Sequence, residues 1–499
     1  MDKTTLAATL MTRPSPNGEE LQALPRTVEW LEVRADLVGD LGANWLRSHF
    51  RGKLLYTLRS QAEGGNFSGP PDERHARLLK AGRDYELVDL EGDCDNAPEV
   101  LAGIPAAKRL VSWHGPATDV EALQSRCEQL STIAARCYRV VPTAAKAGDE
   151  LAPLALLKSL GRSDVIAYAD GQTGFWSRLV APQLGSPFIF GAVENGRNDS
   201  AMPTVARLIT DYGFPELTPA TEIYGIVGNP VAHSLSPCLH NASYRALAHP
   251  ALFVPFHVES FSNFWREVVL GRTLEHLGLS IRGLTVASPH KETAIAEAGS
   301  ISHMVERAGA ANLFVRHNGI WQADTTDPAG VVVALHERAI QIEKKRAAVV
   351  GCGGAGRAIS AALEQAGARV TMVNRGMERG RHAVRLLHLP FVPLADFNVE
   401  GYDIVVNATP VGRDDGALPF EIEDLSAEAV VVDLVYGAEP TPLAASVRAR
   451  GQVMIDGREV LLTQVLRQFR LMTNREMPVS LARQKLGWEA EPTGLATVV

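Results

Sequence analysis

The sequence predicts an α/β protein in which an eight-stranded (β/α)8 barrel precedes a two-lobed region. Three observations lead to this fold class. Short β-rich runs alternate with helical stretches about eight times within residues 1–217, as such a barrel requires. A second α/β segment covers residues 222–328. A third, over residues 329–453, carries a glycine-rich turn between a strand and a helix, which is typical of nucleotide-binding folds.

Turn residues and a weakening hydrophobic periodicity predict two further domain boundaries. Tyr212–Thr221 contains Gly213, Pro215 and Pro219, so we expect a short linker between the barrel and the second segment. At the other end we expect helices over residues 454–480 and a flexible tail over residues 481–499.

Composition excludes several classes of protein. The 499 residues are 46% hydrophobic and 21% charged, which suits several folded domains. The net charge of −8 and the lack of a long basic run argue against nucleic acid or an anionic membrane as a partner. Five cysteines at irregular spacing, with no C-x-x-C pair, argue against a metal site. No apolar run is long enough for a membrane helix, and Thr5–Met11 lacks the basic start of a leader, so we expect a cytoplasmic protein.

Polar residues follow most strands of the predicted TIM barrel. The predicted strands are Thr5–Met11, Val28–Val33, Lys53–Leu58, Tyr85–Leu90, Arg109–Trp113, Tyr138–Val141, Asp164–Tyr168 and Phe188–Phe190. At or after their carboxyl ends stand Glu32, Arg34, Arg59, Glu91, His114, Arg139 and Arg178. Barrel active sites lie on that rim, and guanidinium groups bind carboxylates through paired hydrogen bonds. The pattern therefore favours a small substrate that carries a carboxylate and hydroxyl groups.

The third segment contains a dinucleotide-binding motif. Ala347–Val350 predicts a buried strand and Arg357–Ala366 a helix. Between them Gly351, Cys352, Gly353, Gly354, Ala355 and Gly356 satisfy G-x-G-x-x-G. Gly351 permits the tight turn, Gly353 lets the backbone approach a pyrophosphate, and Gly356 allows close packing of helix on strand. The context predicts a Rossmann fold.

The end of the next strand predicts which dinucleotide binds. Val370–Val373 is followed by Asn374 and Arg375, where an NAD site usually has an acidic residue for the ribose 2′-hydroxyl. An arginine at this position can pair with a 2′-phosphate, so we expect NADP. The alternative is that Arg375 is an ordinary solvated arginine at a strand end.

Motifs spread over residues 222–475 resemble those of shikimate dehydrogenases. They are Ile226–Pro237, Gly283–Glu292, Gly309–Asn312, Asp324–Gly330, Asn407–Gly412, Asp433–Tyr436, and Gly457 with Gln464. The resemblance implies that Ser234 and Ser236 hold the substrate carboxylate. It further implies that Asn312, Tyr436 and Gln464 bind substrate, that Thr409 binds the cofactor, and that Lys291 and Asp327 are catalytic.

Reduction of a ring ketone by hydride needs a proton donor at the carbonyl oxygen, and a lysine held by a carboxylate can supply it. The resemblance thus implies NADP-dependent interconversion of 3-dehydroshikimate and shikimate. Ala287 and Thr325 stand where the family usually has threonine and asparagine. Quinate or another cyclohexane carboxylate therefore stays open as the substrate.

The amino-terminal part resembles type I 3-dehydroquinate dehydratases. The matching segments are Glu32–Asp36, Thr57–Ser60, Glu63–Gly65, Ser112–His114 and Ser177–Arg178. The resemblance implies that Glu32, Arg34, Arg59 and Arg178 bind substrate and that His114 is the general base. That family also forms a Schiff base through a lysine on the sixth strand. Here Arg139 takes that position, Lys146 lies seven residues further on, and Ser200–Thr204 departs from the family's substrate-covering loop.

Two functions remain open for the barrel. In the first, the chain is bifunctional and the barrel dehydrates 3-dehydroquinate. In the second, the barrel is an inactive binding module in front of a monofunctional dehydrogenase, because guanidinium cannot condense with a ketone. Small-molecule substrates are the partners expected in both, and the oligomeric state is open, with a homodimer among the options.

Overall fold

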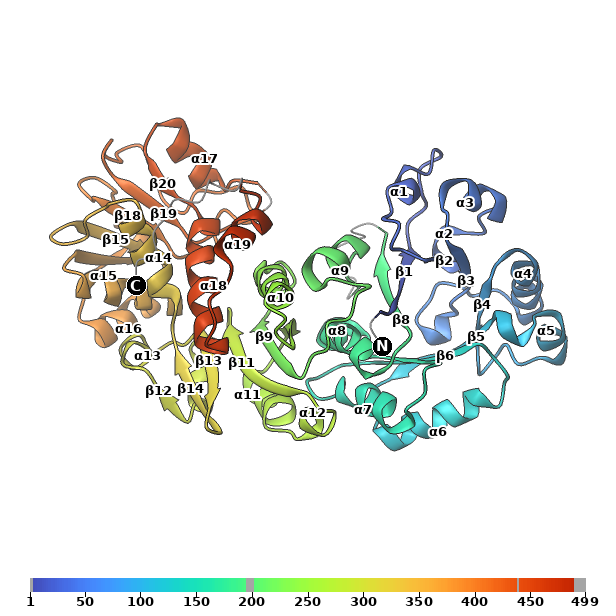
Figure 1. Cartoon of the computed structure of the whole chain (residues 1–499). Helices are drawn as coiled ribbons and strands as arrows, with labels where there is room; N and C mark the ends of the chain where they lie inside the picture. The colour runs from blue at the N-terminus through green and yellow to red at the C-terminus, as the bar shows by residue number, and fades with distance from the viewer. Residues whose placement is uncertain (1–2, 194–201, 438, 489–499) are drawn as a thin grey trace. The chain divides into compact units, whose positions relative to one another are not determined.

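A computed structural model of the chain describes residues 3–193, 202–437 and 439–488 (Figure 1). The chain forms two compact units. One contains the residues up to Gly225 together with Pro230–Ile281, and the other contains Ile226–Asn229 and the residues from Arg282 onward. Within the described ranges, no helix combines the length and the apolar character needed to cross a bilayer.

Eight parallel strands in the first unit form the predicted barrel, which is nearly closed. Their order is β7-β6-β5-β4-β3-β2-β1-β8, so the first strand has the second and the eighth as neighbours. The strands are β1 (Thr5–Leu10), β2 (Trp30–Arg34), β3 (Lys53–Thr57), β4 (Leu87–Glu91), β5 (Arg109–Pro116), β6 (Cys137–Thr143), β7 (Val165–Ala167) and β8 (Phe188–Ala192). Because helices cover the outside, both faces of these strands are buried.

Helices surround the strands (Figure 1). They are α1 (Glu19–Gln22), α2 (Ala35–Val38), α3 (Ala43–His49), α4 (Pro71–Asp84), α5 (Pro98–Gly103), α6 (Val120–Ser131), α7 (Leu151–Leu160), α8 (Gly171–Val180) and α9 (Val205–Tyr212). Local sequence sets several of their starts. The side chains of Asp119 and Thr204 cap α6 and α9, and Pro71 opens α4, where the missing N–H costs nothing.

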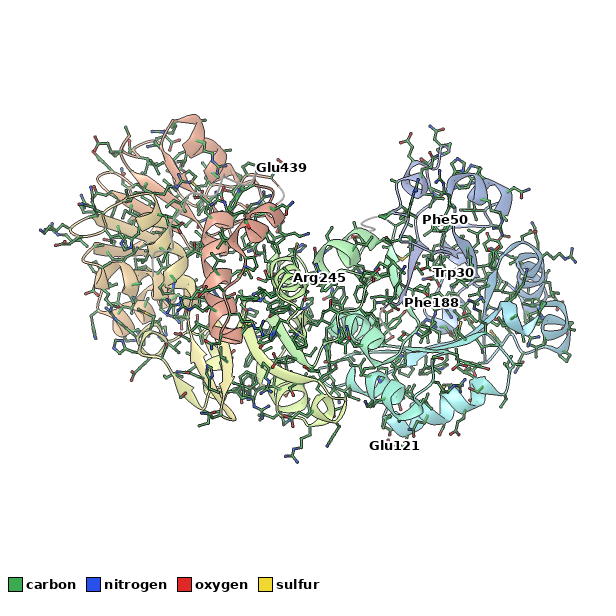
Figure 2. The ribbon with its side chains drawn as sticks, in the orientation of Figure 1. Trp30, Phe50, Glu121, Phe188, Arg245 and Glu439 are labelled. Atoms are coloured by element: carbon green, nitrogen blue, oxygen red, sulfur yellow. The ribbon has the colours of Figure 1, made fainter. Side chains whose placement is uncertain are left out.

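Aromatic side chains pack at the amino-terminal end of the barrel. Trp30 of β2 and Phe188 of β8 meet edge to face with their ring centroids 5.8 Å apart, on the two sides of β1 (Figure 2). The guanidinium of Arg136 lies 5.4 Å from the centroid of the Trp30 ring. This end of the barrel is therefore a packed apolar layer, and the polar side chains lie at the opposite, carboxyl end of the strands.

The first unit also includes chain that follows the barrel. It contains most of β9 (Glu222–Gly228), then α10 (Ser236–Ala246), β10 (Ala251–His257), α11 (Phe261–Phe264) and α12 (Thr273–His276). Trp176 of α8 meets Phe256 of β10 edge to face, with 5.1 Å between ring centroids. The indole N–H of Trp176 donates to the buried carboxyl of Glu150 at 3.0 Å.

The second unit begins with strands of a six-stranded mixed sheet, whose order is β10-β9-β11-β13-β14-β12. The strand β11 (Ser280–Val286) enters it and pairs antiparallel with β13 (Leu313–His317), which forms a hairpin with β14 (Ile320–Asp324). The short strand β12 (Ser300–Ile301) pairs parallel with β14. After β12 comes α13 (His303–Ala308), and after β14 comes α14 (Asp327–Glu337).

The remainder of the second unit is the predicted Rossmann fold. Its parallel sheet has the order β17-β16-β15-β18-β19-β20, the doubly wound arrangement of dinucleotide-binding domains. The strands are β15 (Arg346–Val350), β16 (Arg369–Asn374), β17 (Phe391–Pro393), β18 (Ile404–Asn407), β19 (Val430–Asp433) and β20 (Val453–Ile455). The helices are α15 (Gly354–Gln365), α16 (Met377–Leu387), α17 (Pro442–Ala449), α18 (Gly457–Thr473) and α19 (Val479–Lys485).

Side chains alternate between two cores on this sheet, as a parallel strand covered on both faces requires. Val349 belongs to the core that also contains Val331 and Val460, whereas Val350 belongs to the core that contains Leu443. The expected tail begins inside α19, and its residues 489–499 lie outside the described ranges.

Glu150 gives this fold a pH-dependent stability. Burial raises the pKa of its carboxyl to about 7, from 4.5. As pH rises from about 4.5 to 7, the unfolded chain releases a proton that the folded chain retains, so the free energy of unfolding falls by on the order of 3 kcal/mol. In the native chain, the thermal midpoint of unfolding, measured by circular dichroism, should fall between pH 5 and pH 7.5. We expect Glu150→Gln to make this fall smaller. The exposed Glu121 provides the control Glu121→Gln, which should leave the slope unchanged. An unaltered slope in Glu150→Gln would contradict the assignment.

Candidate active sites

Lys291 and Asp327 form an ion pair in the second unit. Lys291 lies in the loop after β11, and Asp327 is the first residue of α14. The Lys291 Nζ donates to the Asp327 Oδ2 at 2.7 Å. The Lys291 side chain is 21% exposed and that of Asp327 is 5% exposed, so the ammonium is the member of the pair that can meet a substrate.

Two amides hold the other oxygen of Asp327. Its Oδ1 accepts hydrogen bonds from the Asn312 Nδ2 at 2.8 Å and the Gln464 Nε2 at 3.2 Å. Asn312 is itself fixed by Thr326, whose backbone N–H donates to the Asn312 Oδ1 at 2.7 Å. The structure therefore brings together four predicted residues, Lys291, Asp327, Asn312 and Gln464, from widely separated parts of the sequence.

The glycine motif makes the turn that its spacing predicts. Gly351 has φ of +114°, in the left-handed region that favours glycine. A Cβ on Gly356 would lie 1.7 Å from the carbonyl oxygen of Gly351, so only glycine fits there. A Cβ on Gly354 would lie 2.7 Å from the Cβ of Ala310 and 3.2 Å from the Cβ of Lys291. The motif thus packs directly against the side chain of the paired lysine.

The residues around this turn fit a dinucleotide that carries a ribose phosphate. Gly353 caps α15, and a Cβ there would have only the guanidinium of Arg379 nearby, at 3.9 Å from its Nη1. Asn374 accepts a hydrogen bond from the backbone N–H of Cys352 at 3.1 Å, which places the exposed Arg375 beside the turn. Thr409 follows β18, and its hydroxyl donates to Asn407 at 2.6 Å.

Sequence reasoning missed two arginines near the turn. Arg379 lies in the first turn of α16, four residues after Arg375, and a second arginine so soon after the strand end was a usable signal. Arg357 is 1% exposed and donates to the carbonyl oxygens of Ala308, Gly309 and Cys352 at 2.7–3.1 Å, and to Glu292 at 3.3 Å. It ties the glycine turn to the segments that carry Lys291 and Asn312. The only sign of this role in the sequence is that Arg357, a charged residue, directly follows the motif on a helix face expected to be apolar.

The predicted substrate serines lie close to each other. The backbone N–H of Ser236 donates to the Ser234 hydroxyl at 3.2 Å, at the start of α10. Ser236 is buried, and both serines belong to the first unit, whereas Lys291 belongs to the second. Tyr436 follows β19 and is half-buried. Among the described residues, no cluster of His, Cys, Asp and Glu side chains could hold a metal ion.

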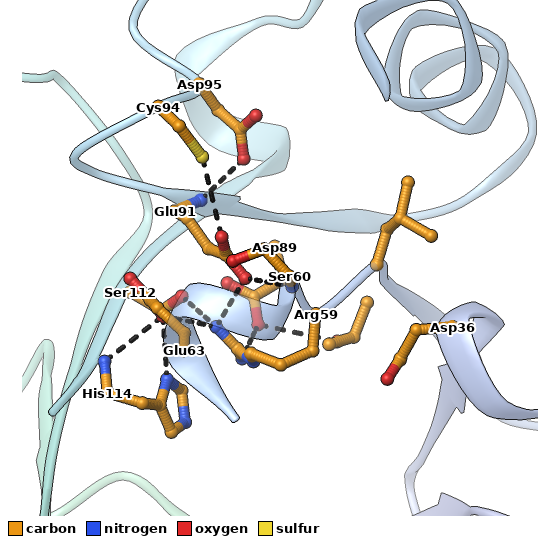
Figure 3. Close-up of polar contacts among 12 residues, drawn as sticks. Asp36, Arg59, Ser60, Glu63, Asp89, Glu91, Cys94, Asp95, Ser112 and His114 are labelled. Atoms are coloured by element: carbon orange, nitrogen blue, oxygen red, sulfur yellow. Dashed lines mark hydrogen bonds and ion pairs between the residues drawn. The ribbon is translucent and has the colours of Figure 1, made fainter. Parts of the chain in front are cut away.

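In the barrel, His114 forms a pair with Glu63 (Figure 3). The His114 Nδ1 lies 3.1 Å from the Glu63 Oε2, which also accepts the backbone N–H of His114 and, at 2.8 Å, a hydrogen bond from Arg59. Burial, opposed by Arg59 and reinforced by two neighbouring carboxylates, raises the pKa of Glu63 to about 8. Burial also lowers the pKa of His114 well below its usual value.

The predicted arginines of the rim surround this histidine. The positive charges of four arginines further depress the pKa of His114, and they are Arg59, Arg139, Arg34 and Arg178. Arg59 also reaches Asp89 at 2.6 Å and the Ser112 hydroxyl at 2.9 Å (Figure 3). Arg34 pairs with Asp36 at 2.8 Å, and Arg178 pairs with Asp170 at 3.2 Å.

Arg139 lies inside the barrel, at the position where the resemblance expects lysine. Its Nη1 donates to the Glu32 Oε1 at 2.8 Å and lies 3.7 Å from Asp89. Glu32 also accepts hydrogen bonds from the hydroxyls of Thr9 and Thr57. Burial alone would raise the pKa of Glu32, but Arg139 and these donors lower it to about 2. Lys146 is exposed, and the predicted loop Ser200–Thr204 lies partly outside the described residues.

Comparison with known proteins finds a family model that matches each of the two regions. Residues 9–216 match the family model of type I 3-dehydroquinase, and residues 226–314 match that of the shikimate dehydrogenase substrate binding domain. The NADP(+) shikimate dehydrogenase of Syntrophobacter fumaroxidans is 33% identical over 266 residues, 52% of this chain and 89% of that protein. The chloroplastic bifunctional 3-dehydroquinate dehydratase/shikimate dehydrogenase of Arabidopsis thaliana is 25% identical over 454 residues, 86% of this chain and 74% of that protein.

A solved structure, shikimate dehydrogenase from Aquifex aeolicus, is 28% identical and covers 53% of this chain and 97% of its own, with a TM-score of 0.49. The identity to the Syntrophobacter enzyme, over nearly its whole length, is high enough to assign the family of the carboxy-terminal region. The chain therefore belongs to the shikimate dehydrogenase family, and the region ahead of its dehydrogenase part matches the type I 3-dehydroquinase family model.

Proposed function

We propose that the carboxy-terminal region interconverts 3-dehydroshikimate and shikimate with NADP. The observation that carries this proposal is the 2.7 Å pair of Lys291 and Asp327, packed against the glycine turn of a Rossmann fold. NADPH supplies the hydride for ketone reduction when it is bound. The chain must supply a proton at the carbonyl oxygen and hold the substrate.

Lys291 donates that proton as the alkoxide develops, and accepts it back in the reverse reaction. Asp327 orients the ammonium, because its Oδ2 accepts the 2.7 Å hydrogen bond from the Lys291 Nζ. Asn312 and Gln464 fix the second oxygen of Asp327 and lie where their amides can meet ring hydroxyls. Ser234 and Ser236 bind the substrate carboxylate, with Tyr436 as a further contact.

NADP is bound through the turn and the arginines that follow β16. The backbone N–H groups at the start of α15 would face the pyrophosphate of the cofactor, and Thr409 lies at the end of the neighbouring strand. Arg375 and Arg379 would pair with the 2′-phosphate. The residues Ala287 and Thr325 leave quinate as the competing substrate, and initial rates on shikimate and quinate decide between the two.

The barrel has a second candidate function, dehydration of 3-dehydroquinate, whose product is the ketone that the reductase uses. The observation that favours it is His114, which Glu63 orients and which burial and four arginines keep neutral, as suits a general base facing an anionic substrate. If the barrel is only a binding module, it will bind 3-dehydroquinate without releasing the enone product.

Replacing the proposed proton donor should separate chemistry from binding. We expect Lys291→Met to lower kcat for shikimate oxidation by roughly 10²- to 10⁴-fold, the usual range for a positioned acid or base, with little change in KM for NADP. The surface pair of Lys345 and Asp403, at 3.0 Å in the same unit, gives the control Lys345→Met, for which we expect wild-type kcat. A wild-type kcat in Lys291→Met would refute the role.

The close approach of the glycine turn to Lys291 can be tested with one methyl group. We expect Gly354→Ala to push the turn away from Lys291 and lower kcat about tenfold or more, since small misplacements of reacting groups are costly. Ala310 supplies the nearest atom, so adding Ala310→Gly should recover part of the loss. Steady-state rates of the single and double variants check the coupling, and equal rates in the two would argue against it.

Cofactor choice should depend on Arg375. We expect Arg375→Ala to reduce the preference for NADP over NAD about tenfold or more, the loss of one charge-assisted hydrogen bond. Arg381, exposed on α16, gives the matched control Arg381→Ala, which should keep the preference. The ratio of kcat/KM for the two cofactors is the measurement, and a ratio unchanged by Arg375→Ala would show that this arginine does not bind the 2′-phosphate.

A further inference from the structure

No lysine of the described barrel is buried, whereas Arg59, Arg139 and Arg178 are. The lysines of the described barrel are Lys3, Lys53, Lys80, Lys108, Lys146 and Lys158. Lys108 precedes β5 and so lies at the opposite end of that strand from His114. The cations that surround His114 are arginines, which stay protonated and cannot form an imine.

Arg139 is held rigidly beside the histidine. In the pairing of β5 with β6, Arg139 is opposite Ser112, which is two residues from His114 and therefore on the same face of its strand. Glu32 fixes one end of the guanidinium, and the ring of Phe190 lies 4.3 Å from its carbon. This guanidinium has a permanent charge and little freedom to move.

Buried donors on two arginines lack partners. Arg139 is 4% exposed, and its Nε and Nη2 have no hydrogen-bond acceptor within the described residues. Arg178 is 3% exposed, and its Nε and Nη1 have none in that same part of the chain. Leaving such groups unsatisfied costs free energy, so they point to a ligand with oxygen atoms that accept at both arginines.

We propose that the barrel removes water from a β-hydroxy ketone through an enolate stabilised by Arg139, without a covalent intermediate. The proposal rests on the dehydration proposed above for the barrel. The substrate class is a cyclic β-hydroxy ketone with a carboxylate, whose ketone oxygen accepts from the Nε and Nη2 of Arg139. The substrate carboxylate accepts hydrogen bonds from the Nε and Nη1 of Arg178.

Each step balances without a further reactant. His114 removes a proton from the carbon next to the carbonyl, and the electrons of that C–H bond form the enolate, whose oxygen faces Arg139. The carbonyl then reforms, the bond to the β-hydroxyl breaks, and the proton on His114 leaves with the hydroxide as water. The products are an enone and water, and His114 returns to its neutral form.

Electrostatics favour this route at this site. Fixed donors that face a developing oxyanion stabilise it strongly where water is excluded. Burial and the neighbouring arginines keep His114 neutral, which leaves its ring able to accept a proton. The arginines also lower the energy of an anionic intermediate. A lysine that forms an imine must lose its proton first, and Arg139 has no such requirement.

The test uses the full chain and 3-dehydroquinate without nucleotide. We expect enone absorbance to rise, borohydride added during turnover to leave the rate unchanged, and the mass of the intact protein to show no reduced adduct. An adduct on any lysine would overturn the imine-free route and leave barrel dehydration standing. Absence of enone from the native chain would overturn both.

Variants locate the effect at Arg139. We expect Arg139→Met to lower the rate of enone formation by roughly 10²- to 10³-fold, in the range for removal of an oxyanion donor. Arg136, exposed at the other end of β6, gives the control Arg136→Met, which should keep the native rate. A native rate in Arg139→Met would overturn the proposal.

Arg139→Met leaves Glu32 without its cation, so folding is checked by near-ultraviolet circular dichroism. Arg139→Lys retains the charge, and we expect borohydride to inactivate this variant during turnover while the native chain resists. Equal resistance in both would show that a lysine here does not meet the ketone, and would overturn the placement of the carbonyl at residue 139.

Discussion

The carboxylate of Asp327 is the point on which the geometry of the second unit depends. One of its oxygens binds Lys291 and the other binds Asn312 and Gln464, so three distant segments converge on the first residue of α14. A carboxylate this buried is tolerable only with such a set of donors, and the helix start adds a favourable dipole. The same donors fix where the ammonium points.

The barrel satisfies its buried charges by a related arrangement. Glu32 accepts from two threonine hydroxyls and one guanidinium, and Arg59 binds two carboxylates of β4, those of Asp89 and Glu91. An arginine at position 139 keeps this network paired while it changes the chemistry that the site can perform. Structural likeness to a family and retention of its reaction are therefore separate questions at this position.

How much of the molecule the sequence reveals depends on the range of each interaction. Alternating strands and helices and the spacing of Gly351, Gly353 and Gly356 are local signals, and they predict the barrel and the Rossmann fold correctly. Arg357 could not be assigned from sequence, because its acceptors at Ala308 and Gly309 are nearly fifty residues away along the chain. The bond between His114 and Glu63 likewise depends on how the fold brings the loop after β3 next to β5.

The contact of Trp176 with Phe256 affects where the chain could be divided into separately folding fragments. Proline and glycine at residues 213–219 suggest a natural place to cut, yet β10 and α10 belong to the same compact body as the barrel. A fragment that stops at that linker would expose the indole of Trp176 to water, and a reductase fragment that starts there would expose Phe256. The linker is thus not a boundary of the folded protein, and replacing the region on either side of it would require repacking the surface left behind.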